Sequence, residues 1–123
     1  MVRHKKQMTN NNKKYKKYAE FVDNVHSMTF GVVLLNKKEM EKVCKKESMQ
    51  FFDGYFDGEN NNFVFYKPNP GVVAHEAFHG LEFTLFHRRH YTINLEGYNE
   101  HLAYYLDFLV ANITDCLESL TKK

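Results

Sequence analysis

Two histidines and a glutamate form the pattern in this chain with the clearest chemical potential, His75-Glu76-Ala77-Phe78-His79. Side chains four residues apart leave the same face of a helix, so the imidazoles of His75 and His79 could bind one zinc ion. A glutamate beside the first histidine can then take a proton from a water molecule that the zinc activates. The pattern predicts Zn²⁺ as the cofactor and Glu76 as the catalytic base.

The motif requires a helix, and its flanking residues predict one from about Pro70 to Arg88 or Arg89. Asn69 suits the N-cap, and Pro70 suits the first helical position. We expect an apolar stripe that packs on the core, made of Ala74, Phe78, Leu81 and Leu85. His75, His79 and Glu82 would lie on a neighbouring stripe, where Glu82 either supports a histidine or faces solvent.

Upstream of the motif, the chain alternates between helical and extended patterns. Apolar residues recur at helical spacing over residues 15–25 and predict a short helix, namely Tyr15, Tyr18, Ala19 and Val22. Met28–Leu35 predicts a buried strand, and Lys37–Glu47 predicts an amphipathic helix with Met40, Val43 and Cys44 inside. The aromatic runs of Phe51–Tyr66, separated by Asp, Gly and Asn, predict an antiparallel hairpin.

A last long helix should run from Leu95 or Asn99 to Leu120. Its core stripe comprises Leu102, Leu106, Leu109, Ile113, Leu117 and Leu120. The element order predicts an α+β fold, in which a small antiparallel sheet packs on the motif helix and on a following helix that bears a glutamate. With 123 residues, the chain should form one domain over residues 18–123, preceded by a basic arm over residues 1–17.

Catalytic zinc usually has three protein ligands and one open position. Glu100 lies at the start of the last helix, and the short connection after the motif would place the two helices antiparallel. It is the favoured third ligand, and Glu96, next to Gly97, is the alternative.

The two motifs together, His75-Glu76-x-x-His79 and Asn99-Glu100-x-x-Ala103-Tyr104, resemble the gluzincin branch of zinc metallopeptidases. The chain is most similar to the small minigluzincins and to short, uncharacterised bacteriophage proteins with H-E-x-x-H and N-E-x-x-A-Y motifs. The resemblance covers roughly residues 63–113 and implies a zincin-like fold. For the site, it implies the zinc ligands His75, His79 and Glu100, the base Glu76, and Ala103 as the small residue that lets the helices approach.

One position departs from that family. Gluzincin peptidases often carry an aspartate four residues after the ligand glutamate, where it orients a ligand histidine. This chain has Tyr104 there, so Tyr104, Asn99 or a backbone carbonyl would have to orient the histidine. The oxyanion donor also stays open among Tyr98, Tyr104, Tyr105, His90 and His101.

The resulting hypothesis is a zinc-dependent metallopeptidase that hydrolyses peptide bonds with a zinc-activated water. A peptide or protein substrate would bind near the Phe51–Tyr66 hairpin. The alternative is a non-catalytic zinc-binding zincin-fold protein of phage origin that contacts a host or virion protein.

The remaining polar residues carry weaker signals. The arm has seven basic residues and no acid from Arg3 to Lys17; we interpret it as a solvated segment, with nucleic-acid binding as the weaker alternative. Cys116 falls on the core stripe, and the pair His87/His90 marks a helix end. His4, His26 and His101 are expected on the surface. With no signal peptide or membrane span, we expect a cytoplasmic protein, in the host cytoplasm if it is phage-encoded.

Overall fold

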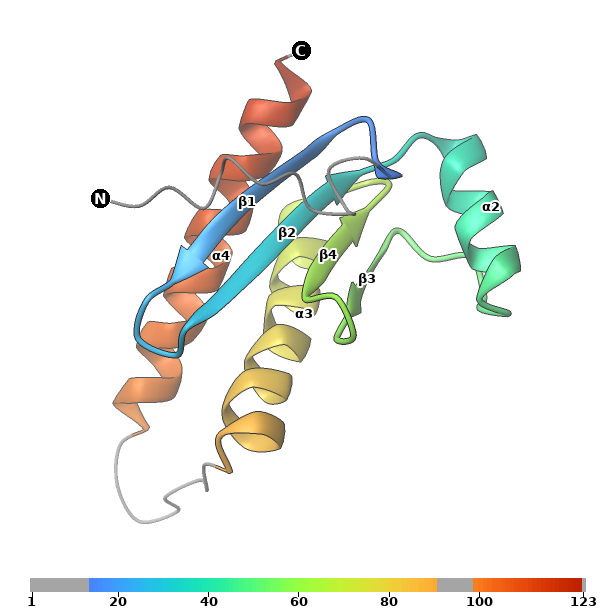
Figure 1. Cartoon of the computed structure of the whole chain (residues 1–123). Helices are drawn as coiled ribbons and strands as arrows, with labels where there is room; N and C mark the ends of the chain where they lie inside the picture. Colours follow the sequence, from blue (N-terminus) through green and yellow to red (C-terminus); the bar gives the residue numbers. More distant parts are fainter. Residues whose placement is uncertain (1–13, 91–98, 123) are drawn as a thin grey trace.

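The chain folds as a mixed sheet with helices on both faces (Figure 1). The structure is a computed structural model, and it describes residues 14–90 and 99–122. Its elements are β1 (Tyr18–Asp23), β2 (Met28–Leu34), α2 (Lys37–Lys46), β3 (Gly54–Asp57), β4 (Asn62–Phe65), α3 (Pro70–Leu81), the π-helical segment η2 (Glu82–Arg88) and α4 (Glu100–Thr121). These elements confirm the predicted α+β class. They also confirm the strand that begins at residue 28, the helix α2, the hairpin and both long helices.

The four strands lie in the order β1-β2-β4-β3. β1 and β3 pair antiparallel with their neighbours, whereas β2 and β4 pair in parallel. The sheet is thus mixed, and the prediction of an antiparallel sheet was wrong for its central pair. The chain between β2 and β4 includes α2 and β3, which return it to the end of the sheet where β2 began. β3 becomes an edge strand beside α3.

The first strand corrects the prediction of a helix over residues 15–25. Phe21 and Asp23 are 8% and 3% exposed, whereas Val22 between them is 48% exposed. This alternation is the period of a strand, in which successive side chains point to opposite faces. Phe21 pairs with Phe30 of β2 and stacks on its ring at 5.3 Å between centroids.

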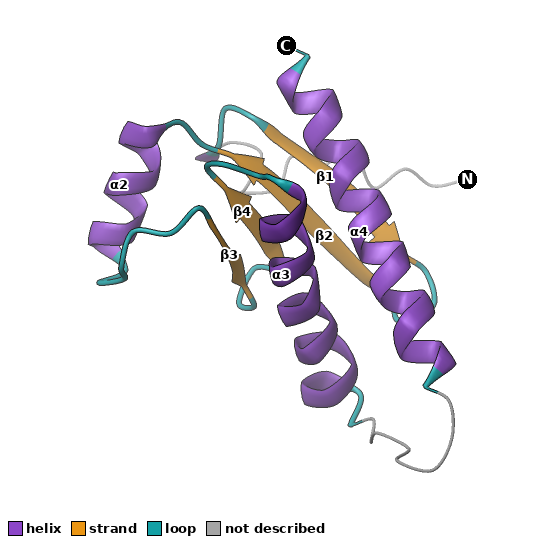
Figure 2. Cartoon of the chain, turned by 180° about the vertical axis from the view of Figure 1, so that it is seen from behind, coloured by secondary structure: helices purple, strands orange, loops and turns teal. Residues whose placement is uncertain are grey.

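The two faces of the sheet carry separate apolar clusters. α3 and α4 cover one face, where Leu81 and Leu109 pack with Phe30 and Phe63 (Figure 2). On the other face, Met40 and Cys44 of α2 pack with Val33 and Val64. α3 thus packs on β3 and β4 and beside α4, and the side of α3 that bears His75 and His79 remains exposed.

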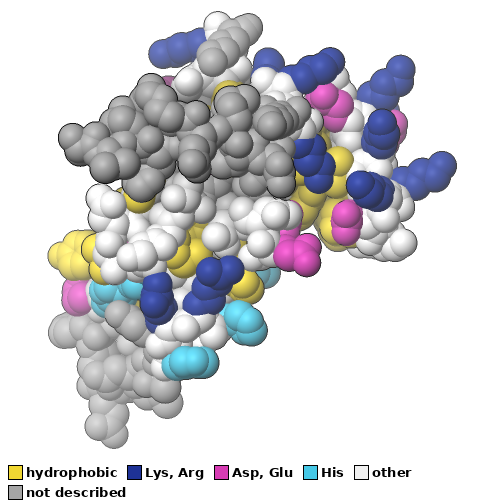
Figure 3. All heavy atoms as spheres, viewed as in Figure 1, with side chains coloured by type: hydrophobic (Ala, Val, Ile, Leu, Met, Phe, Trp, Pro, Cys, Tyr) yellow, Lys and Arg dark blue, Asp and Glu magenta, His cyan; other side chains and the backbone are white. Residues whose placement is uncertain are grey.

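Helix α2 presents a basic outer surface. It starts at the capping box formed by Asn36 and Glu39, and its exposed lysines are Lys37, Lys38, Lys42, Lys45 and Lys46. Figure 3 shows these dark-blue side chains spread over the α2 side of the molecule. Of the basic arm predicted for residues 1–17, the structure describes residues 14–17: Lys14 lines a hollow with Lys46, and Lys16 and Lys17 line another with Lys37.

Helix α4 follows the predicted stripe closely. Leu109, Ile113, Leu117 and Leu120 are buried, and Leu102 and Leu106 are partly buried against the same cluster. Its other face is polar. Within residues 14–90 and 99–122, no helix is both long enough and apolar enough to cross a membrane.

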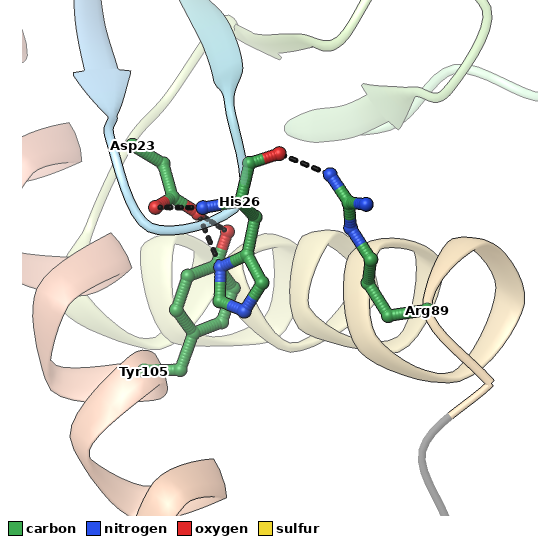
Figure 4. Close-up of polar contacts among 4 residues, drawn as sticks. All are labelled: Asp23, His26, Arg89 and Tyr105. Carbon is green, nitrogen blue, oxygen red and sulfur yellow. Dashed lines mark hydrogen bonds and ion pairs between the residues drawn. The ribbon is translucent and has the colours of Figure 1, made fainter.

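A buried polar cluster ties the β1–β2 turn to both long helices (Figure 4). Asp23 accepts a hydrogen bond from the hydroxyl of Tyr105 on α4 at 2.7 Å and contacts Nδ1 of His26 at 2.8 Å. Arg89, just after η2, donates to the backbone carbonyl of His26. His26 is only 6% exposed, so its expected place on the surface was wrong; the carboxylate of Asp23 and the ring of Tyr105 enclose it.

Candidate functional site

The histidines of the H-E-x-x-H motif face each other on the accessible side of α3. Their Nε2 atoms lie 3.2 Å apart, with the rings nearly perpendicular at 79°. Two nitrogens that each lie 2.0–2.1 Å from one zinc ion in tetrahedral geometry would be separated by roughly 3.3 Å. The spacing of His75 and His79 therefore fits two ligands of one tetrahedral metal ion.

Glu82 contacts His79 at Nδ1, the ring nitrogen that does not face His75. Its Oε1 atom lies 3.0 Å from Nδ1 of His79. An ionised carboxylate only accepts hydrogen bonds, so this contact is made by Nδ1 carrying a proton, and in the neutral imidazole Nε2 then has the lone pair that a metal needs. A carboxylate behind a histidine is the common support of metal-binding imidazoles. Glu82 thus contacts His79 while 48% of its side chain remains exposed to solvent.

Glu76 lies one residue after the first histidine and faces the protein. Its side chain is 6% exposed, although it still lines the cleft beside His75 and His79. Burial raises the pKa of the Glu76 carboxyl, and the charges of the two neighbouring imidazoles act in the opposite direction. A carboxyl that is buried but open to a cleft is a suitable general base.

The motif lines a cleft between α3 and the edge strand. The cleft has a volume of about 680 Å³, and its walls comprise Phe52, Gly54, Tyr55, Phe56 and Gly58 on one side and His75, Glu76, His79, Glu82, Phe83 and His87 on the other. A second hollow of about 390 Å³ shares Phe52, Gly54, His75 and Glu76 and extends to Asn69, Gly71 and Val72. The motif thus lies where two hollows meet along β3.

Glu100 does not lie with the histidines. Gly80 of α3 is in van der Waals range of Leu109, and Val73 shares a small pocket with Val110 and Leu117, so α3 and α4 run antiparallel. Glu100 precedes Leu109 by nine residues, which is about 13 Å along a helix axis. It therefore lies near the level of the η2 end, and within residues 14–90 and 99–122 no three His, Cys, Asp or Glu side chains are grouped to hold a metal.

The other residues assigned from the sequence are also distributed away from the cleft. Tyr105 is buried and donates to Asp23, while Tyr104, His90 and His101 are exposed and line neither hollow. Tyr98 and Glu96 lie outside the described residues. Ala103 is exposed, so it does not have the predicted place between the two helices.

The chain matches no protein-family model, no curated protein and no solved structure. What the site can do therefore follows from its own chemistry. The structure adds Phe83 and His87 to the residues that line the cleft, and sequence reasoning did not assign them to it. Their signal was present, because residues 75, 79, 83 and 87 recur at the same four-residue interval as the two ligand histidines.

Proposed function

We propose that the chain is a zinc-dependent metallopeptidase in which His75 and His79 hold the metal and Glu76 is the general base. The observation that carries the proposal is the 3.2 Å separation of the two Nε2 atoms beside the carboxyl of Glu76. The resemblance of the two sequence motifs to gluzincins supports the same assignment. A zincin-like arrangement, with an edge strand beside the motif helix, is part of this proposal.

Zinc at this position would act as a Lewis acid on the scissile carbonyl and make an attacking water more acidic. Glu76 would accept the proton of that water and deliver it to the leaving amine. Glu82 would keep the proton of His79 on Nδ1, which leaves Nε2 free to bind the metal.

The edge strand gives an extended peptide a place to bind. In the described part of the chain, β3 pairs only with β4, so its other edge is open beside the motif. A peptide added there would gain backbone hydrogen bonds that do not depend on its sequence. Its carbonyl groups would pass the junction of the two hollows, next to His75 and Glu76.

Metal content tests the ligand set directly. We expect about one zinc per purified chain by elemental analysis and a large loss in His75→Ala and His79→Ala. His90→Asn is the matched control, because His90 is exposed and has a positive φ of 58°, which asparagine tolerates. Glu100→Gln decides its predicted role: a loss of zinc would show that the start of α4 approaches the histidines when metal binds, and unchanged zinc would exclude Glu100 as a ligand.

Turnover tests the catalytic role. Wild-type protein loaded with zinc should cleave members of a peptide library, and Glu76→Gln should lower the rate by at least a hundredfold while keeping its zinc. Equal turnover by both proteins would refute the mechanism. Zinc binding without any turnover would favour the alternative, a non-catalytic module whose exposed Phe51 and Phe52 contact a partner protein.

A further inference from the structure

We infer that the cleft selects peptides that carry an aromatic side chain on the N-terminal side of the cleaved bond. The inference rests on the proposed peptidase function and adds the substrate class. It concerns the end of the cleft beyond His79, where Phe56, Phe83 and His87 form three aromatic walls.

The three aromatic side chains pack against one another. The ring of Phe83 stacks on His87 at 5.0 Å between centroids and meets the ring of Phe56 edge-on at 5.7 Å. A Cβ atom at Gly58 would come within 2.9 Å of Phe83, so the glycine leaves room for that ring. Such an aromatic wall favours another ring, which gains edge or stacking contacts in addition to its burial.

The π-helical segment brings these side chains to the cleft. Along an α-helix, a stripe of every fourth residue drifts around the axis, because four residues exceed one turn. A π-helix has more residues in each turn than an α-helix. Over Glu82–Arg88 it therefore counteracts the drift, and both Phe83 and His87 line the same cleft as His75 and His79.

The charges around these walls disfavour a basic side chain. The guanidinium of Arg88 already lies 4.8 Å from the ring centroid of Phe83, where a ligand cation would otherwise bind. Glu82, a carboxylate that lines the cleft beside Phe83, contacts Nδ1 of His79. A neutral ring needs no carboxylate and can contact the edges of the Phe83 and Phe56 rings, and the cleft volume of about 680 Å³ accommodates a large side chain.

The direction of β3 places the aromatic side chain relative to the cleaved bond. Gly54 lies against Val72, and Gly58 lies against Phe83, so β3 and α3 run in the same direction. Antiparallel pairing is the more stable choice for an added strand. A peptide antiparallel to β3 therefore has its N-terminal part beside Phe83 and its C-terminal part beside Val72, with Glu76 between them.

Binding to Glu76→Gln tests the selection without turnover. The probes are short acetylated peptides built from Gly, Ser and Ala that differ only at the central residue, which is Phe, Ala or Lys. Calorimetry with zinc-loaded protein measures their dissociation constants. We expect the Phe peptide to bind about tenfold tighter than the Ala or Lys peptide. Adding Phe83→Ala should reduce the ratio of the affinities for the Phe and Ala peptides to about twofold. If Phe83→Ala fails to fold, the exposed His87→Ala serves as the second variant and should have the same effect. Phe51→Ala, outside the cleft, should preserve it.

Cleavage sites in a peptide library test the direction in which the peptide lies along β3. We expect Phe, Tyr and Trp to be enriched on the N-terminal side of the cut. Equal binding of the three peptides, or enrichment only on the C-terminal side, would overturn the inference while the peptidase proposal stands. Preferential binding of the Phe peptide to a protein that cleaves nothing would overturn the peptidase proposal and, with it, the assignment to a cleaved bond.

Discussion

The Nδ1 atom of His79 lies 3.0 Å from the Oε1 atom of Glu82, within one turn of the same helix. The contact comes from the motif helix itself, whereas the family resemblance predicts that a residue of the following helix, Tyr104 or Asn99, orients the ligand histidine. Tyr104 is 68% exposed and does not line the cleft. Within the described residues, the contact that His79 makes through Nδ1 thus comes from Glu82.

Removing Glu82 should therefore weaken metal binding without unfolding the chain. Supports of this kind typically contribute 10–100-fold to metal affinity, and we expect a loss of that size for Glu82→Ala. Competition with a chromophoric chelator at neutral pH measures it. Glu118→Ala, exposed on α4, is the matched control. Equal zinc affinity of Glu82→Ala and wild type would show that the contact does not orient the ligand.

Gly80 is required for α3 to pack on the sheet. A Cβ atom at this position would lie 2.5 Å from the ring of Phe63, which is fully buried and cannot move aside. We expect Gly80→Ala to reduce the free energy of unfolding by about 1–3 kcal/mol, despite the better helix propensity of alanine. Urea denaturation measures this change. Gly71→Ala, in the exposed first turn of α3, would bring a Cβ atom only to 3.3 Å from Oδ1 of Asn69 and should stay within about 1 kcal/mol of wild type.

The hydroxyl of Tyr105 should stabilise the fold through its hydrogen bond to Asp23. Tyr105→Phe leaves the buried carboxylate without one partner, which should cost about 1–3 kcal/mol of unfolding free energy. The adjacent Tyr104→Phe provides the control, because that side chain is exposed. The denaturant midpoint should fall for Tyr105→Phe only, with unchanged m-values in both. A matching loss in Tyr104→Phe would contradict this assignment.

The same cluster explains why the first strand was mistaken for a helix. Ala19, Phe21 and Asp23 share one face of β1. Because Asp23 is polar, the sequence does not show the two-residue apolar period of a strand. His26 is a local partner of the buried Asp23, but Tyr105, which also donates to it, lies 82 residues away in the chain. No local pattern contains that partner. The elements whose signals were local, such as the Asn69 cap and the stripe of α4, were predicted correctly.

The buried face of the motif helix was predicted less well than its existence. Ala74 and Phe78 were expected in the core and are exposed, while Val73, Ala77 and Gly80 are buried. A large apolar side chain at 78 suggested burial, but the tight contact with Phe63 is made at Gly80, two residues later and on the other side of the helix. The spacing of His75 and His79 followed from helix geometry. The position of Glu100 along α3 could not be predicted from helix geometry, because it depends on how α4 packs against α3.

Acid should remove the contribution of Asp23 to stability. Burial alone would raise the pKa of its carboxyl, but hydrogen bonds from Tyr105 and from the backbone and ring of His26 outweigh burial, so the pKa is lowered. The unfolded chain, with an ordinary aspartate pKa of about 3.9, then binds the proton more readily than the folded chain. The stabilisation is complete above about pH 5 and is lost as the pH falls through the folded pKa. Urea denaturation from pH 6 to pH 3 should show wild type losing its advantage over Asp23→Asn, with Tyr105→Phe intermediate. An advantage that grows as the pH falls would mean that the carboxyl is protonated more readily in the folded protein.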